Sequence, residues 1–224
     1  MEVLKTFRHE FKYVISYDES LRLREKLDQV LRYDRSSRGY MVRSLYFDSV
    51  DDEDYYDKQG GEIKRKKIRL RIYDTTSDYV KLELKGKYDI HQLKESLVIN
   101  RAVAKELIKG NYGVLLNYDS DTAKKIYVIM AMGGYRPKVI IEYERIAYIT
   151  ATTTRITMDY NIKRSYDFDN FFNDQVNYVT VVDNRDMVLE VKYDRFLESY
   201  LGNIMSNYIT RYQSVSKYVM GRNI

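Results

Sequence analysis

Cysteine and tryptophan are absent from this sequence, and proline occurs only once, at Pro137. Without cysteine the chain has no disulfide framework, no thiolate metal site and no cysteine nucleophile, which fits a reducing compartment. The first residues lack the apolar core of a signal peptide, and no run approaches the length that crosses a bilayer. We therefore expect a soluble, cytoplasmic protein.

Charge and tyrosine, in contrast, are plentiful. Charged residues make up 32% of the 224 residues, and there are 24 tyrosines. The length of 224 residues suits one domain of moderate size or two small ones, and the hydrophobic share of 44% is enough for a sizeable core. Of the two, we expect a single domain over residues 1–224. The net charge of +5 is compatible with a polyanionic partner but does not require one.

Two neighbouring stretches, 64–73 and 79–85, alternate charged and apolar side chains, which predicts a β-hairpin with one face of each kind. The charged set consists of Arg65, Lys67, Arg69, Arg71, Lys81, Glu83 and Lys85. The apolar set consists of Ile68, Leu70, Ile72, Val80, Leu82 and Leu84. A solvated surface sheet is one interpretation, and an anion-binding interior is the other. Lys64 and Lys66 have the parity of the apolar set, so we expect them to point away from any bound anion.

Similar patterns predict further strands over residues 6–16, 40–48, 92–100, 137–145, 152–160 and 187–193. Helices are predicted from Asp18 onward and over residues 51–56, 102–109, 122–132 and 195–209. Many strands with a few helices indicate an α+β fold with a large antiparallel sheet or a closed barrel. Because unpaired buried cations cost more than a domain's net stability, a charged interior must be wet, paired with carboxylates or filled by an anion.

Eight short motifs follow one another along nearly the whole chain. They are Arg8–Tyr13 (RHEFKY), Arg43–Asp48 (RSLYFD), Arg69–Tyr73 (RLRIY), Leu82–Lys85 (LELK), Glu142–Arg145 (EYER), Arg155–Asp159 (RITMD), Leu189–Lys192 (LEVK) and Ser216–Tyr218 (SKY). In this order they resemble the VTC domain, the polyphosphate polymerase branch of the triphosphate tunnel metalloenzymes. The resemblance implies an eight-stranded antiparallel closed β-barrel with flanking helices. It also implies transfer of the γ-phosphate of ATP to a growing polyphosphate chain, with Mn²⁺ or Mg²⁺.

The resemblance also implies a role for individual residues. The implied catalytic residues are Arg69, Arg71, Lys85 and Arg155. The implied substrate-binding residues are Lys12, Lys94, Tyr143, Arg145, Lys192, Ser216 and Lys217, and the implied metal ligand is Glu190. These types suit the chemistry, since arginine offers a planar fork to phosphate, lysine a mobile charge, and a carboxylate a hard oxygen for the metal. Glu83 is expected to pair with lysines, whereas Asp48 and Asp159 are either metal-side or structural.

Two positions depart from the family pattern. The wider tunnel family opens with Glu-x-Glu-x-Lys, but Arg8 takes the first place here and only Glu10 and Lys12 match. This departure favours the polymerase over a triphosphatase. Ser214 stands where a second lysine is expected beside Ser216 and Lys217, which puts one phosphate contact in doubt.

The expected partners are ATP and polyphosphate. No nucleic acid is expected, because aromatic and basic residues do not interleave in an RNP-like pattern. We expect no membrane insertion by this chain, although a membrane partner protein is compatible with the resemblance. The alternatives are a tripolyphosphatase or nucleoside triphosphatase of the same fold, or a non-catalytic polyphosphate-binding module.

Overall fold

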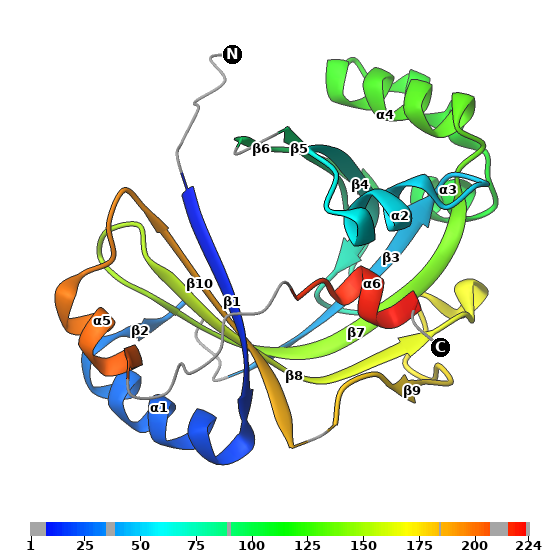
Figure 1. Ribbon diagram of the computed structural model, residues 1–224. Helices are drawn as coiled ribbons and strands as arrows, with labels where there is room; N and C mark the ends of the chain where they lie inside the picture. The colour runs from blue at the N-terminus through cyan, green and yellow to red at the C-terminus, as the bar shows by residue number, and fades with distance from the viewer. Residues whose placement is uncertain (1–7, 35–38, 89–90, 184, 207–214, 223–224) are drawn as a thin grey trace. The chain divides into compact units, whose positions relative to one another are not determined.

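The computed structural model of the chain describes residues 8–34, 39–88, 91–183, 185–206 and 215–222 (Figure 1). Backbone contacts divide these residues into two compact units. The first unit is drawn from residues 1–41, 143–162 and 180–216, and the second from residues 42–142, 163–179 and 217–224. Two long strands, β7 (Arg136–Ile149) and β8 (Arg155–Ser165), contribute residues to both units.

The strands form an antiparallel sheet with the hydrogen-bonded order β1-β10-β8-β7-β3-β4-β5-β6. The bounds of the other six are β1 (Arg8–Ser16), β3 (Tyr40–Asp48), β4 (Lys64–Ile72), β5 (Tyr79–Tyr88), β6 (His91–Asn100) and β10 (Asp186–Asp194). Two short strands, β2 (Arg32–Tyr33) and β9 (Val179–Thr180), pair with β7 and β8. The predicted α+β class with a large antiparallel sheet is therefore confirmed. Among the described residues no pairing joins β1 to β6, so the closed barrel is not confirmed.

The first unit has a core between its strands and two helices, α1 (Tyr17–Val30) and α5 (Ser199–Ser206). Leu23 and Leu27 of α1 and Leu201 of α5 are fully buried in this core. The two helices lie side by side (Figure 1). Helix α1 begins after Ser16, whose side chain and that of Glu19 form a capping box, rather than at Asp18 as predicted.

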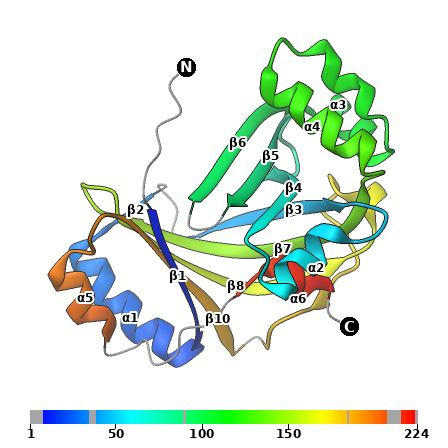
Figure 2. The same ribbon diagram turned by 45° about the horizontal axis from the view of Figure 1, so that its top comes forward.

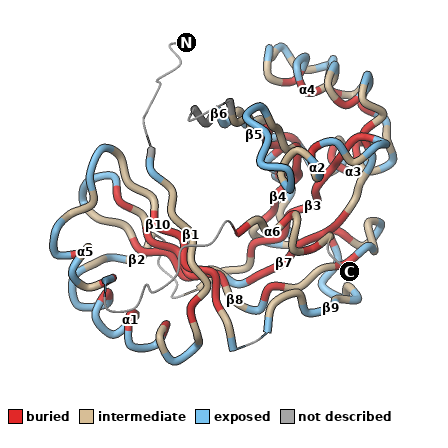
Figure 3. Tube along the Cα trace, in the orientation of Figure 1, coloured by how far each residue is buried: buried red, intermediate tan, exposed pale blue. Residues whose placement is uncertain are grey.

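The second unit has its core on the apolar face of β4 and β5, where Ile68, Leu70 and Leu82 are fully buried. Helices α3 (Arg101–Ile108), η1 (Tyr112–Asn117) and α4 (Asp121–Met132) contribute to the same core, and α3 and α4 lie close to β6 (Figure 2). Asn100 and Ser120 accept hydrogen bonds from the first turns of α3 and α4. Buried residues follow the strands, and exposed residues mark the outer helix faces (Figure 3).

Several predicted helices differ from those observed. The helix predicted over residues 195–209 begins only at Ser199, because Arg195 has a left-handed φ of 54°. Its predicted last residues lie outside the described ones. Helix α2 (Glu53–Gly60) begins two residues after the start of the predicted range 51–56, extends past its end, and stops at the left-handed Gly61. Val30 is 47% exposed and therefore does not continue the buried stripe of α1.

Along the described residues, no helix combines the length and apolarity needed to cross a membrane.

A short C-terminal helix, α6 (Lys217–Arg222), was not predicted and packs closely on β7. A Cβ atom at Gly221 would lie only 2.1 Å from Cδ1 of Ile141. The carbonyl of Gly221 accepts a hydrogen bond from Arg164 at 3.1 Å. Arg222 adds two ion-paired hydrogen bonds to Asp52, at 2.8 and 2.9 Å. Glycine at position 221 therefore permits the close docking of α6.

Gly221→Ala should lower the free energy of unfolding by about 2 kcal/mol, because the added methyl overpacks the contact with Ile141. Gly202→Ala is the matched control, since a Cβ atom there would meet no atom within 4 Å. In the interior of α5 the control should be neutral or stabilising by about 0.5 kcal/mol. Urea unfolding measures both variants. Equal stabilities for the two would contradict the close docking of α6.

Candidate functional site

In the second unit, one face of strands β3 to β6 carries four of the predicted phosphate ligands, Arg69, Arg71, Lys85 and Lys94. Residues directly opposite one another in antiparallel strands share a face. The register therefore defines a β3–β6 polar face made of Ser44, Tyr46, Lys67, Arg69, Arg71, Lys81, Glu83, Lys85 and Lys94. It holds six cations and a single carboxylate. The predicted alternation of charged and apolar faces is confirmed for β4 and β5.

Glu83 lies at the centre of this face and is fully buried. Its Oε2 atom accepts from Nε of Arg69 at 2.6 Å, and its Oε1 atom lies 2.6 Å from Nζ of Lys94. Burial raises the pKa of the Glu83 carboxyl, but the charges of Arg69, Arg71 and Lys94 outweigh burial and hold this pKa well below its usual range. The expectation that Glu83 pairs with a lysine is confirmed.

Strand β3 orients the two arginines. Nε of Arg71 donates to Oγ of Ser44 at 3.0 Å, and Nη1 of Arg69 donates to the Tyr46 hydroxyl at 3.1 Å. Arg69 and Arg71 are only 7% and 8% exposed, which rules out a freely solvated surface at these two positions. Sequence reasoning missed Ser44 and Tyr46, because β3 is buried at successive positions and shows no alternation.

Lys64 and Lys66, the two lysines that alternate with the charged set of β4, have different surroundings. Lys64 is exposed, as expected for a residue that points away from the polar face. Nζ of Lys66 lies 3.1 Å from Oδ1 of the buried Asp54 in α2. Burial raises the pKa of Asp54 to about 7 despite the opposing charge of Lys66. Lys66 therefore has a structural role that parity alone does not indicate.

In the first unit, β1, β10 and β8 form a second polar face in which carboxylates and lysines alternate. Lys12 lies opposite Glu190, and Glu10 lies opposite Lys192. Nζ of Lys12 lies 2.6 Å from Glu10, and Nζ of Lys192 lies 2.7 Å from Glu190. Burial raises the pKa of Glu190, but the charges of Lys192, Lys12 and Arg145 dominate and hold it well below its usual range.

Arg145 of β7 completes this group. Its guanidinium forms a bidentate pair with the fully buried Asp159, at 2.6 and 2.7 Å. Nη2 of Arg145 lies 3.3 Å from the Tyr143 hydroxyl and 3.9 Å from Glu190. Asp159 therefore positions Arg145. Of the two roles considered for Asp159, metal-side or structural, this is the structural one.

Three other predicted ligands have different surroundings. The Arg155 guanidinium pairs with Asp34 and donates to the Tyr40 hydroxyl at 3.0 Å. Ser216 precedes α6, and Lys217 begins it. Lys217 lies close enough to Tyr46 for its charge to help lower the pKa of that phenol. The side chain of Arg8 and the whole of Ser214 lie outside the described residues.

Asp48 has a structural role at the start of α2. Its carboxylate is fully buried and accepts from the backbone N–H groups of Asp54 and Tyr55, both at 2.9 Å. It also accepts from the hydroxyl of Tyr218. These bonds cap α2 and attach α6 to it.

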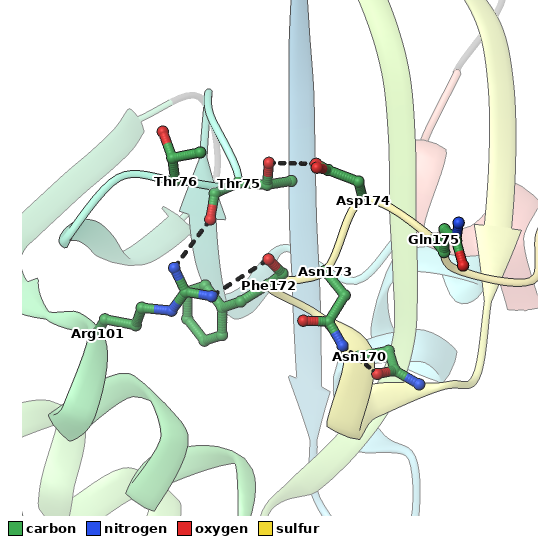
Figure 4. Close-up of a pocket in the computed structure, with 8 residues that line it drawn as sticks. All are labelled: Thr75, Thr76, Arg101, Asn170, Phe172, Asn173, Asp174 and Gln175. Carbon is green, nitrogen blue, oxygen red and sulfur yellow. Dashed lines mark hydrogen bonds between the residues drawn. The ribbon is translucent and has the colours of Figure 1, made fainter.

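A separate cavity of about 800 Å³ in the second unit contains none of the predicted ligands (Figure 4). Eight residues line it: Thr75, Thr76, Arg101, Asn170, Phe172, Asn173, Asp174 and Gln175. The guanidinium of Arg101 donates to the carbonyls of Thr75 and Phe172, at 3.0 and 3.3 Å, and lies over the Phe172 ring. Arg101 therefore links the β4–β5 turn to the segment that carries Phe172.

Glu190, the predicted metal ligand, and Glu10 are carboxylates of the polar face in the first unit, and each contacts two lysines. Within the described residues there is no cluster of three or more histidine or acidic side chains suited to a metal ion. A complete protein cage is therefore not formed there. Magnesium is commonly held by only one or two carboxylates together with substrate phosphates. The pair formed by Glu190 and Glu10 matches that pattern.

Glu83→Gln should lower the free energy of unfolding at pH 7 by about 3 kcal/mol, because Arg69 loses its buried partner. The Glu83 pKa is lowered by folding, so its contribution is complete above the unfolded pKa of about 4.3 and is lost as the pH falls. Urea unfolding between pH 7 and pH 3 should show that the difference in unfolding free energy between wild type and Glu83→Gln becomes smaller as the pH falls. Glu62→Gln, at an exposed carboxylate, is the control and should not differ from wild type. A difference in unfolding free energy between wild type and Glu83→Gln that does not change with pH would contradict an ionised, ion-paired Glu83.

Comparisons with known proteins identify the family of the chain and structures that share its fold. The VTC domain matches residues 7–224, whereas no curated protein matches the chain. A putative adenylate cyclase from Bacillus halodurans is 12% identical, with 90% of this chain and 86% of that chain covered and a TM-score of 0.53. The putative adenylyl cyclase HpAC1 from Hippeastrum, described as having a dominant triphosphatase activity, is 15% identical, with 95% and 94% covered and a TM-score of 0.59. At such identities the two structures show a shared fold alone. Because the family match extends from before β1 through α6, this chain belongs to the VTC domain family.

Proposed function

We propose that the chain is an ATP-dependent polyphosphate polymerase, which transfers the γ-phosphate of ATP to the end of a growing polyphosphate chain. The observation that carries this proposal is the β3–β6 polar face, whose nine residues include six cations and one carboxylate. An excess of buried and half-buried cations is stable only with an anion or water beside it. Condensed phosphate, with its regular array of anionic oxygens, is the ligand that suits such a face best.

The residues of this face have distinct tasks in the proposed reaction. Arg69 and Arg71 bind phosphate oxygens through their planar forks, and Lys85 and Lys94 add mobile charges. A terminal oxygen of the polyphosphate attacks the γ-phosphorus of ATP, and the bond from that phosphorus to the β–γ bridging oxygen breaks as ADP leaves. The attacking oxygen is already anionic, so no general base is needed. Positioning and electrostatic stabilisation therefore supply most of the catalysis.

The polar face of the first unit carries further proposed ligands of its own. Lys12, Lys192 and Arg145 would bind further phosphate oxygens, and Glu190 with Glu10 would hold Mn²⁺ or Mg²⁺. Such a metal ion offsets negative charge on the phosphates. The same proposal assigns phosphate contacts to Tyr143, Arg155, Ser216 and Lys217. Two further predictions belong to this proposal: a single domain over residues 1–224, expected from length and composition, and a closed eight-stranded barrel, implied by the family resemblance.

Hydrolysis of tripolyphosphate or nucleoside triphosphates is the second candidate. The observation that favours it is the pairing of Glu10 with Lys12, the part of the Glu-x-Glu-x-Lys pattern that this chain retains. The triphosphatase activity attributed to HpAC1 also supports it. Both candidates use the same phosphate-binding residues. They differ in whether water or a phosphate chain accepts the transferred group.

Incubation of the pure protein with ATP and Mn²⁺ or Mg²⁺ separates the candidates. Polymerase activity should yield ADP and a ladder of polyphosphate on a gel. Free phosphate without a ladder would establish the hydrolase instead. Retained binding of polyphosphate with neither product would indicate a non-catalytic binding module.

Arg71→Ala should raise the dissociation constant for tripolyphosphate at least about tenfold, because it removes a charge-assisted hydrogen bond. Arg71 is preferred to Arg69, whose loss would leave the buried Glu83 with less compensation. Lys64→Ala removes an equal charge from the other face of the same strand and should bind normally. Isothermal titration calorimetry at fixed salt measures all three proteins. Equal affinities for Arg71→Ala and Lys64→Ala would contradict the proposed binding face.

A further inference from the structure

Tyr46 lies on β3 in the β3–β6 polar face, directly opposite Arg69 in the neighbouring strand β4. Its side chain is almost completely buried, with 5% of the residue exposed. Its hydroxyl oxygen accepts a hydrogen bond from Nη1 of Arg69 at 3.1 Å. The other nitrogens of that guanidinium, Nε and Nη2, both lie 2.6 Å from Glu83. Arg69 thus holds the Tyr46 oxygen and the Glu83 carboxylate with one rigid fork.

The phenolic proton of Tyr46 has no acceptor among the residues that the structure describes. Arg69 can only donate, so it cannot take this proton. A buried hydroxyl that leaves its proton without an acceptor loses free energy relative to water. The nearest charged neighbours that act on the phenol are Arg69, Arg71 and Lys217, all of them cations. The ligand that would complete this arrangement is an anion with an oxygen that accepts the proton.

The Tyr46 ring is held in one place. It stacks on the ring of Tyr218 with 5.1 Å between centroids and 25° between planes. The hydroxyl of Tyr218 donates to Asp48, at the start of α2. Tyr218 is therefore satisfied by the protein, whereas Tyr46 is satisfied only as an acceptor. The two hydroxyls of one stacked pair have different environments.

We propose that Tyr46 is a substrate-binding residue that donates its phenolic proton to a phosphate oxygen bound by Arg69 and Arg71. This inference rests on the proposed function, because it takes condensed phosphate as the ligand of that face. A neutral donor beside two arginines adds a directional bond without adding another positive charge to repel them. The positive charges nearby also strengthen the donor, since despite burial they lower the pKa of the Tyr46 phenol.

Tyr46→Phe tests the proposal because it removes the hydroxyl and keeps the ring. Titration calorimetry with tripolyphosphate, without ATP, should show a dissociation constant about tenfold higher than that of wild type. Tyr218→Phe removes the same atom from the other ring of the stack. That control should lower the melting temperature, because Asp48 loses a donor, and should leave the affinity unchanged.

The pH dependence of binding provides a second measurement if Tyr46→Phe also loses stability. Ionisation of the phenol removes the donor and places a negative charge beside the phosphate. The affinity advantage of wild type over Tyr46→Phe should therefore shrink as the pH rises towards the lowered pKa of Tyr46. The charged groups that act on the phenol are Arg69, Arg71 and Lys217, with Glu83 beyond Arg69. Lys67 and Asp48 contact the ring and the hydroxyl of the stacked Tyr218. Both proteins contain all six, so their titration cancels in the ratio.

The outcomes separate the inference from the proposed function. A tenfold loss confined to Tyr46→Phe, with an advantage that disappears at alkaline pH, supports the inference. Equal affinities of wild type and Tyr46→Phe at neutral pH would overturn the inference alone. Wild-type protein that binds no tripolyphosphate would overturn the proposed function together with the inference. An affinity ratio that does not change up to alkaline pH would show that the hydroxyl does not donate a proton to the ligand, and would also overturn the inference.

Discussion

The buried ion pair between Arg69 and Glu83 is the interaction on which the second unit depends. Six cations on one face of four strands repel one another, and a single fully buried carboxylate reduces that repulsion. Glu83 can bear its charge there because Arg69 and Lys94 both contact it at 2.6 Å. The pair therefore allows a cationic face to fold while leaving most of its charge for a ligand. Removing either partner would leave the other buried and uncompensated.

Carboxylates also compensate cations in the first unit, where the numbers of carboxylates and lysines are more nearly equal. Its carboxylates and lysines alternate from strand to strand, so that Glu10 and Glu190 each contact two lysines. Asp159 holds Arg145 by both of its oxygens. Where the structure gives a contact for a predicted phosphate-binding cation, the partner is a carboxylate, a hydroxyl or both. These partners orient the cation. In phosphoryl transfer such prior orientation lowers the reorganisation needed when the substrate arrives.

The sequence predicted the features that depend on local periodicity. Alternation alone assigned Arg69 and Arg71 to the face opposite Leu70, and the register of β4 and β5 agrees. The helix predicted over residues 122–132 agrees with α4 to within one residue. The motif order identified the family, because it reflects a set of positions along the whole chain rather than one local pattern.

Features that depend on contacts between distant segments could not be predicted. Nothing near Arg155 indicates that its guanidinium pairs with Asp34, more than one hundred positions away. Helix α6 has six residues, which is too few for a recognisable period. Tyr46 lies in a strand that is buried on both sides, so its polar role has no signature in the pattern. Long-range pairing, rather than propensity, determines these positions.

A crystal structure with tripolyphosphate bound would test the central claim most directly. We predict that its phosphate oxygens lie within hydrogen-bonding distance of Arg69, Arg71 and the Tyr46 hydroxyl. Glu83 should keep its contact with Arg69 in that complex. Tripolyphosphate bound elsewhere, with these three side chains touching only water or protein, would contradict the account.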